Sequence, residues 1–326
     1  MRRRDFTAGL LGAATLGAWP LSARAQQAAM PVVGFLRVTS AADSAHLAAA
    51  FRQGLKESGF NEGQNVAIEY RYAENQRERA PALAADLIGR KVAVIATDQA
   101  VREVKAASST IPILFVLGAD PVAAGLVASL NRPGANVSGI VFFSSQLGAK
   151  RIELLRQLVP AATTIGVLAF AVSPEDKTER DQIEAAAAGA GQQLLIADVA
   201  QEADIDKAFA SFAEKGVGAV LVGSGPFFRS HKEKIVALAL RYALPTSYSL
   251  REYVGAGGLM SYGTSITNAY REAGKYAARV LKGEKPADLP VLQSTKFEFV
   301  INLKTAKTLG LVVPQQLQVA ADEIIE

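Results

Sequence analysis

Cysteine is absent from this chain of 326 residues, and histidine occurs only twice, as His46 and His231. Without cysteine the chain can form no disulfide, no thiolate metal site and no cysteine nucleophile. Two isolated histidines give no basis for a multi-histidine metal centre or a proton relay. The sequence also has no Gly-x-Ser-x-Gly motif, and Gly223-Ser224-Gly225 lacks the lysine of a phosphate-binding loop. We therefore expect no metal, no cofactor and no catalytic residue.

Positive and negative residues nearly balance over most of the chain. The formal net charge is +4, but residues 1–25 hold four arginines and one aspartate, so the rest is close to neutral. This balance argues against an electrostatic nucleic-acid binder. No later segment is apolar over the roughly 18 residues that a membrane span needs, so we expect no stable membrane insertion. With 50% hydrophobic and 20% charged residues, the composition is that of a globular protein.

The first 25 residues have the layout of an export signal. A basic Arg2-Arg3-Arg4 start precedes the apolar stretch 8–21, and Ala23-Arg24-Ala25 then forms a small-x-small cleavage site. Arg3-Arg4-Asp5-Phe6 resembles a twin-arginine signal, with the general secretory route as the alternative. We expect cleavage after Ala25 and a periplasmic protein.

After residue 30 the chain alternates short apolar runs with amphipathic segments. The first set of predicted strands is 32–38, 66–72, 92–97, 111–117 and 137–143, and the predicted helices between them include one at 122–130. The pattern then restarts, with predicted strands at 165–170, 193–198, 217–222 and 245–249 separated by helices. This alternation predicts two parallel, doubly wound sheets.

The last 65 or so residues are too few for a third lobe. They hold predicted strands at 259–262 and 297–301, a helix at 268–281 and a terminal helix at 303–309, which fit best as additions to the two sheets. The chain would then cross between lobes near residues 143, 261 and 292. The predicted fold is therefore α/β, with two lobes joined by a three-segment hinge. Lobe 1 would comprise 30–143 plus 262–291, and lobe 2 would comprise 144–261 plus 292–326.

Several segments together resemble one known family. They are Phe51-Arg52-Gln53-Gly54-Leu55, Glu62-Gly63-Gln64-Asn65-Val66, Asp120-Pro121-Val122, 131–139, 258–263 and 301–306. In this order and spacing they are similar to the tryptophan/tyrosine-type substrate-binding proteins of ABC transporters. The resemblance implies a type I periplasmic-binding-protein fold, a solute held between the lobes, and delivery to a permease and ATPase complex. We expect a monomer.

Two turns depart from that family. Many relatives carry a Thr-Gly-Gly-like turn after the third strand, where this chain has Thr97-Asp98-Gln99. Many also carry an Asn-Pro-Asn-like loop where this chain has Ala171-Val172-Ser173-Pro174. Because both turns are expected to face the ligand, the resemblance alone does not fix the ligand specificity.

Candidate ligand residues follow the predicted strands, because open α/β sheets bind ligands at the carboxyl ends of their strands. Free N–H groups and hydroxyls at helix starts suit a carboxylate, and carboxylate side chains suit an ammonium. The candidates for these two roles are Thr39, Ser40, Thr97 and Ser173 for the carboxylate, and Asp98, Asp120 or Glu252 for the ammonium. One of Thr39, Ser40 and Ser44 is expected to cap the next helix, and Asp120 has an alternative role as a helix N-cap.

Aromatic side chains at similar positions could hold an apolar or aromatic ligand body. The candidates are Phe227, Tyr248 and Tyr262, with Ser224 beside Phe227; the alternative for Phe227 is that it closes the lobe's core. We therefore expect an extracytoplasmic receptor for an amino acid or an aromatic or apolar carboxylate. The alternatives are a sensor subunit that presents a ligand, or an enzyme on the same scaffold.

Overall fold

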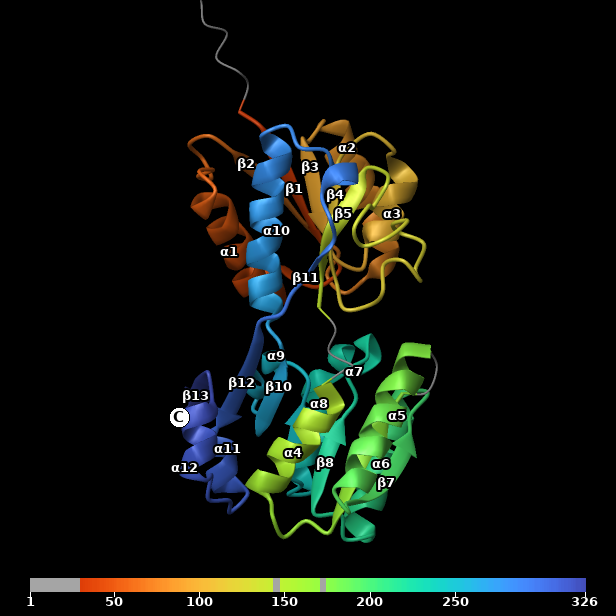
Figure 1. The fold of residues 1–326 in the computed structure, drawn as a ribbon, viewed down its shortest axis with the longest axis vertical. Helices are drawn as coiled ribbons and strands as arrows, with labels where there is room; N and C mark the ends of the chain where they lie inside the picture. The colour runs from red at the N-terminus through yellow and green to blue at the C-terminus, as the bar shows by residue number, and fades with distance from the viewer. Residues whose placement is uncertain (1–29, 143–146, 171–173) are drawn as a thin grey trace, which may run out of the picture. The chain divides into compact units, whose positions relative to one another are not determined.

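Two β-sheets with helices on their faces organise the chain (Figure 1). The computed structural model describes residues 30–142, 147–170 and 174–326. The first sheet has the strand order β11-β5-β4-β3-β1-β2, and the second has the order β13-β12-β10-β9-β8-β6-β7. Neighbouring strands run parallel except β10 and β12, which are antiparallel. The predicted α/β fold with two parallel-sheet lobes is thus confirmed.

The lobe around the first sheet is called lobe 1. Its strands are β1 (Val32–Arg37), β2 (Ala67–Tyr72), β3 (Val94–Thr97), β4 (Ile113–Leu117), β5 (Val137–Val141) and β11 (Leu292–Gln293). Its helices are α1 (Ala41–Glu57), α2 (Ala80–Gly89), α3 (Val101–Ala107) and α10 (Ile266–Leu281), with short 3₁₀ turns η1 (Arg77–Arg79) and η3 (Pro286–Asp288). The central strands are buried along most of their length because helices cover both faces, which explains their continuous apolar sequences.

Helices α1 and α10 lie side by side on one face of this sheet (Figure 1). Two glycines allow this close approach. A Cβ atom on Gly54 would lie 1.9 Å from the carbonyl oxygen of Arg271, and one on Gly274 would lie 2.1 Å from that of Phe51. Helix α10 therefore belongs to lobe 1, although most of lobe 2 precedes it in the sequence.

The predicted helix at 122–130 is wrong, because the segment forms successive turns. The Asp120 carboxylate accepts from the backbone N–H groups of Val122 (2.8 Å) and Ala123 (3.2 Å), as it would at a helix start. Gly125 then adopts a left-handed φ of 68°, which ends the turn before a helix can propagate. The freed carbonyl groups of Gly125 and Leu126 accept from Lys105 on α3.

The lobe around the second sheet is called lobe 2. Its strands are β6 (Thr164–Ala169), β7 (Gln193–Asp198), β8 (Ala219–Val222), β9 (Thr246–Tyr248), β10 (Met260–Thr264), β12 (Phe297–Asn302) and β13 (Glu323–Ile325). Its helices are α4 (Gly148–Leu158), α5 (Pro174–Gly189), α6 (Glu202–Glu214), α7 (Pro226–Ser230), α8 (Lys232–Arg241), α9 (Arg251–Gly255), α11 (Leu303–Thr308) and α12 (Gln315–Ala320). The short elements α7, α9, α12, β11 and β13 were not predicted from the sequence.

The chain passes from one sheet to the other three times. The first passage follows β5, the second lies between β10 and α10, and the third lies between β11 and β12. The predicted crossing at 261 falls inside β10, and the one at 292 falls at the start of β11, so both passages occur a few residues later. Residues 143–146 of the first passage lie outside the described part.

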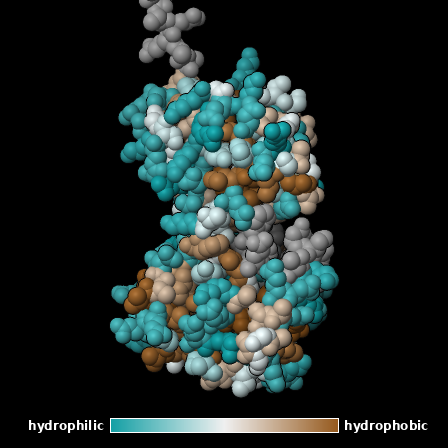
Figure 2. Space-filling view, viewed as in Figure 1, coloured by the Kyte–Doolittle hydropathy of each residue, from teal (hydrophilic) through white to brown (hydrophobic). Residues whose placement is uncertain are grey.

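Hydrophilic residues cover much of the face seen in Figure 2, and apolar residues appear there as separate patches. Within the described residues, no helix combines the length and apolar character required to cross a membrane. The predicted export signal at 1–25 lies outside the described residues.

Candidate functional site

The carboxyl ends of β1 and β3 bring a charged pair together in lobe 1. Arg37 ends β1 and Asp98 directly follows β3, and the Nη1 and Oδ2 atoms of the pair lie 3.0 Å apart. Their side chains are only 11% and 7% exposed. Burial disfavours the charged form of Arg37, but Asp98 and the hydroxyl of Tyr270 outweigh this effect and raise the pKa of Arg37. The guanidinium therefore stays charged beneath the surface of lobe 1.

Hydroxyl groups surround this pair because α1 begins immediately after β1. Ser40 is the N-cap of α1, and its side chain accepts from the backbone N–H of Asp43 (3.2 Å). This sharp turn places Thr39 and Ser44 beside Arg37, which donates to both hydroxyls at 3.1 and 3.3 Å. The structure thus joins predicted residues Thr39 and Asp98 in one cluster, whereas Ser40 serves as the helix cap.

Thr97 ends β3 next to this cluster and is 1% exposed. Its hydroxyl has no hydrogen-bond partner among the described residues. Buried polar atoms are normally paired, so this hydroxyl is an exception among the residues at the strand ends of lobe 1.

Two members of the cluster were missed by sequence reasoning. Arg37 could have been found, because a charged residue at the end of an otherwise apolar strand is unusual. Tyr270 could not, because it lies on α10 and its contact with Arg37 spans 233 residues of sequence.

Aromatic side chains gather at the carboxyl ends of β6 and β8 in lobe 2. These strands are neighbours in the sheet. Phe170 directly follows β6 and Phe227 lies in α7 after β8, and their rings stack with centroids 4.6 Å apart and planes within 9°. His231 lies on Phe227 with a centroid distance of 4.5 Å. Phe170 and Phe227 are half-buried, so they form a wall rather than a closed core; Phe170 was missed by sequence reasoning.

A buried ion pair holds Ser224 at the same edge of lobe 2. Arg151 donates to Glu179 and to the carbonyl oxygen of Val222 (2.6 Å), and its side chain has no exposed surface. One oxygen of Glu179 accepts both the N–H and the hydroxyl of Ser224, each at 2.9 Å. The hydroxyl donor of Ser224 is therefore in use, and its free lone pairs can only accept.

Glu252 lies in α9 with an 18% exposed side chain, and its Oε1 is 3.5 Å from Nε2 of His46 on α1. Burial disfavours its charged form, but the interactions with His46, its own backbone N–H and the charge of Arg229 outweigh burial and lower its pKa. The other oxygen of Glu252 has no hydrogen-bond partner among the described residues. This carboxylate is charged at neutral pH and has one oxygen available to a donor.

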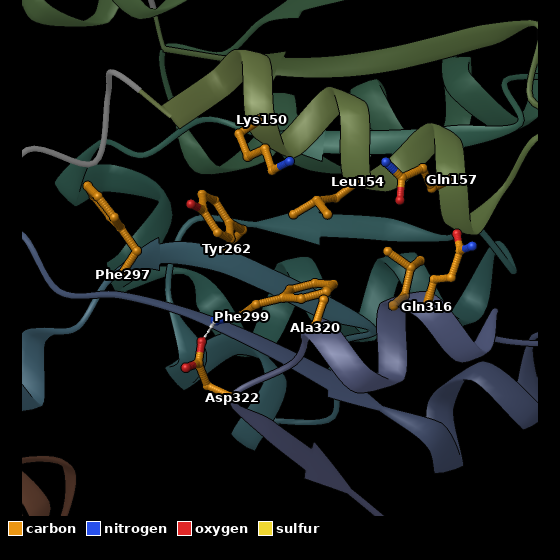
Figure 3. Close-up of a pocket in the computed structure, with 10 residues that line it drawn as sticks. Lys150, Leu154, Gln157, Tyr262, Phe297, Phe299, Gln316, Ala320 and Asp322 are labelled. Carbon is orange, nitrogen blue, oxygen red and sulfur yellow. Dashed lines mark hydrogen bonds between the residues drawn. The ribbon is translucent and has the colours of Figure 1, made fainter.

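The structure places the other predicted residues apart from these clusters. Tyr248 is 1% exposed and stacks on Tyr253 at a centroid distance of 4.7 Å, so its ring lies in the core of lobe 2. Tyr262 lines a separate pocket of lobe 2 (Figure 3). Asp120 is half-buried in its turn, where its carboxylate accepts from the backbone. Ser173 lies outside the described residues.

The described residues contain no group of three or more acidic or histidine side chains placed to hold a metal. The arrangement instead offers a buried cation with hydroxyls in lobe 1, and an aromatic wall with acceptor oxygens in lobe 2. Such groups can bind a small polar molecule with a planar apolar body.

Comparison with known proteins gives a consistent result. Residues 37–325 match the family described as ABC transporter substrate binding protein. The chain is 27% identical over 264 residues to a tyrosine-binding protein of Clostridioides difficile, covering 80% of this chain and 75% of that protein.

Two solved structures are also similar. One is an ABC domain from Streptococcus pneumonia in complex with L-Trp, with 26% identity and a TM-score of 0.76 over 90% of this chain and 99% of that one. The other is a conserved domain protein from Vibrio cholerae, with 25% identity, the same TM-score and the same coverage.

Proposed function

We propose that this chain, which belongs to the family of ABC transporter substrate-binding proteins, captures an aromatic L-amino acid. The membership makes this chain an extracytoplasmic solute-binding protein of an ABC transporter and not an enzyme, as predicted. Relatives named for tyrosine binding and solved with L-Trp support an aromatic ligand.

The stacked pair of Phe170 and Phe227 is the observation that carries this proposal. A ligand ring placed against this half-buried wall gains burial and stacking. Aliphatic amino acids would fill the same space with less contact area, so the wall favours aromatic side chains.

The polar groups fit the two charges of an amino acid. We assign the carboxylate to lobe 1, where Thr39 and Thr97 offer hydroxyls beside the cation of Arg37. We assign the ammonium to Glu252 and to Ser224, whose free atoms accept hydrogen bonds. Binding groups on both lobes would draw the lobes together, which is how a hinged receptor couples binding to a change in shape.

A direct test uses the fluorescence of L-tryptophan itself. Trp19 is the only tryptophan of the chain and lies in the predicted leader, so a chain beginning at Gln26 contributes no indole signal. We expect saturable binding of L-tryptophan, and Phe227→Ala should weaken it by about 5- to 150-fold, corresponding to about 1–3 kcal/mol of lost burial and stacking.

Tyr242→Ala is the matched control. Tyr242 is a half-buried aromatic residue of lobe 2, but it follows α8 and precedes β9, at the opposite edge of the sheet. Its replacement should leave the affinity unchanged. An equal loss in both variants would show that the loss is not specific to the wall, and failure of the unaltered chain to bind L-tryptophan or L-tyrosine would refute the aromatic ligand.

For the N-terminus we propose export by the twin-arginine route, cleavage after Ala25 and a periplasmic, monomeric mature protein. Support comes from the sequence of residues 1–25. Changing Arg3 and Arg4 together to Lys should retain the precursor in the cytoplasm, and N-terminal sequencing of the exported protein should start at Gln26. Unchanged export of the double variant would assign the general secretory route instead.

A further inference from the structure

A pocket opens in lobe 2, over the face of β10 and β12. It measures about 360 Å³, which is within the range of small-molecule sites. Helix α4 supplies one wall and helix α12 the other, and the strands supply the floor (Figure 3). All of its lining residues belong to lobe 2, so it forms without any group from lobe 1.

Aromatic rings make up much of the apolar surface of this pocket. Tyr262 and Phe297 lie nearly parallel with centroids 6.2 Å apart, and Phe299 meets Tyr262 edge-on at 6.3 Å. Phe297 remains 41% exposed, which is high for a phenylalanine. Rings that are partly exposed and parallel offer their faces to a planar guest, because stacking and edge-to-face contacts are favourable at these separations.

Polar groups stand at the rim of the pocket. Lys150 of α4 is the only lysine or arginine among the residues that line it. Gln316 adds an amide group, and the amide of Gln157 already donates to Glu153 at 3.1 Å. Asp322 accepts the backbone N–H of Phe299 (2.8 Å), which commits one of its oxygens to the fold. The present partner of Lys150 is Glu153, one turn away on the exposed face of α4, at 2.8 Å. An exposed pair of this kind is weak, so a ligand carboxylate can compete for Lys150.

We propose that this pocket is a second binding site, which takes a small aromatic carboxylate with its ring against Tyr262 and Phe297 and its carboxylate on Lys150. The site needs no ammonium on the ligand, since Asp322, the carboxylate among its lining residues, lies on the side opposite Lys150 (Figure 3). It is independent of the transported solute, because none of its residues belongs to the clusters at the strand ends. A compact ligand of this size binds with a dissociation constant of about a millimolar or tighter.

Indole-3-acetate tests the proposal, because it has the ring and the carboxylate but no ammonium. Its fluorescence anisotropy would be followed during titration with the chain that begins at Gln26, which has no tryptophan of its own. Indole, which lacks the carboxylate, serves as the second probe. We expect both to bind saturably, and Lys150→Met to weaken indole-3-acetate about 5- to 10-fold while leaving indole unchanged.

Tyr262→Ala should weaken the binding of both probes. Tyr262→Phe keeps the ring and should bind both probes as the unaltered protein does, so the ring can still be tested if the alanine variant folds poorly. Phe227→Ala should leave both unchanged, and Lys150→Met should leave the affinity for L-tryptophan at the strand ends unchanged. These readouts separate this pocket from the proposed transport site. Absence of saturable binding, loss of indole-3-acetate binding in Phe227→Ala, or equal affinities in the Lys150 variant and the unaltered protein would each overturn the proposal.

Discussion

Replacing Asp98 by Asn would test whether charge holds the Arg37 cluster together. The substitution keeps the shape of the side chain and an oxygen that can accept from the N–H of Val38, which lies 3.3 Å from Asp98. It removes the negative charge that lies 3.0 Å from the guanidinium. Arg37 cannot lose its proton instead, because an arginine side chain keeps its proton in proteins whatever its partners.

The size of the effect follows from the burial of the pair. Removing one partner of a buried ion pair costs about 3–5 kcal/mol, because the remaining charge is left uncompensated. Arg37 keeps hydroxyl partners in Thr39, Ser44 and Tyr270, so we expect a loss near the lower end, about 3 kcal/mol. With an unfolding entropy of about 2.1 cal/mol/K per residue, such a loss lowers the melting temperature of a chain of this length by about 5 °C.

The assay is thermal unfolding followed by circular dichroism, with urea unfolding as an independent measure. Asp86→Asn is the matched control, since Asp86 pairs with Arg71 at 2.6 Å in the same lobe but is 43% exposed. Solvent screens that pair, so the control should melt close to the unaltered protein. Equal melting temperatures for the Asp98 and Asp86 variants would refute the argument that the buried charge stabilises lobe 1.

Three further outcomes are expected. Tyr248→Ala should lower the unfolding free energy by about 3–5 kcal/mol, because the ring is fully buried; an unchanged urea midpoint would contradict its place in the core. Gly54→Ala should destabilise the fold by about 1–3 kcal/mol, because the new methyl group meets the backbone of α10. Gly89→Ala, where space is open, should not destabilise it. Similar melting curves for the two variants would argue against the close helix contact. The lowered pKa of Glu252 means that its charge stabilises the fold above the unfolded pKa of about 4.3, and that this contribution disappears as the pH falls through the folded pKa. Melting temperature should therefore fall less steeply with acid in Glu252→Gln than in the unaltered protein, and parallel curves would show that Glu252 contributes nothing.

Apart from the short edge strands β11 and β13, the strands of both sheets could be predicted from the sequence, because parallel strands covered on both faces are almost continuously apolar. The sequence did not predict that Tyr248 lies in the core of lobe 2. The polar residues Ser247 and Ser249 on either side of Tyr248 are typical of an open strand end, but in the structure they are only 0% and 2% exposed. Polar residues inside a buried strand therefore gave a misleading signal. The turns at 122–130 had helical periodicity but were stopped by the backbone of Gly125.

Part of the site could also be predicted, because residues that follow parallel strands converge at one edge. This rule found Thr39, Thr97 and Asp98. It could not find Glu179, whose role depends on accepting two hydrogen bonds from Ser224 across 45 residues of sequence. Contacts of this kind depend on how helices return to the sheet, which no local pattern encodes.

The glycine contact between α1 and α10 bears on how the chain folds. Helix α1 is made early, but the surface that covers it begins at Ile266, after most of lobe 2. The sheet of lobe 2 in turn is incomplete until β12 and β13, near the end of the chain, have been made. Neither lobe can therefore finish folding on a partly synthesised chain, and the sequence separation of these contacts predicts slow folding. A chain cut short before residue 266 would leave exposed the face of α1 around Gly54 that α10 covers. Aggregation would then compete with folding until the last segment is present.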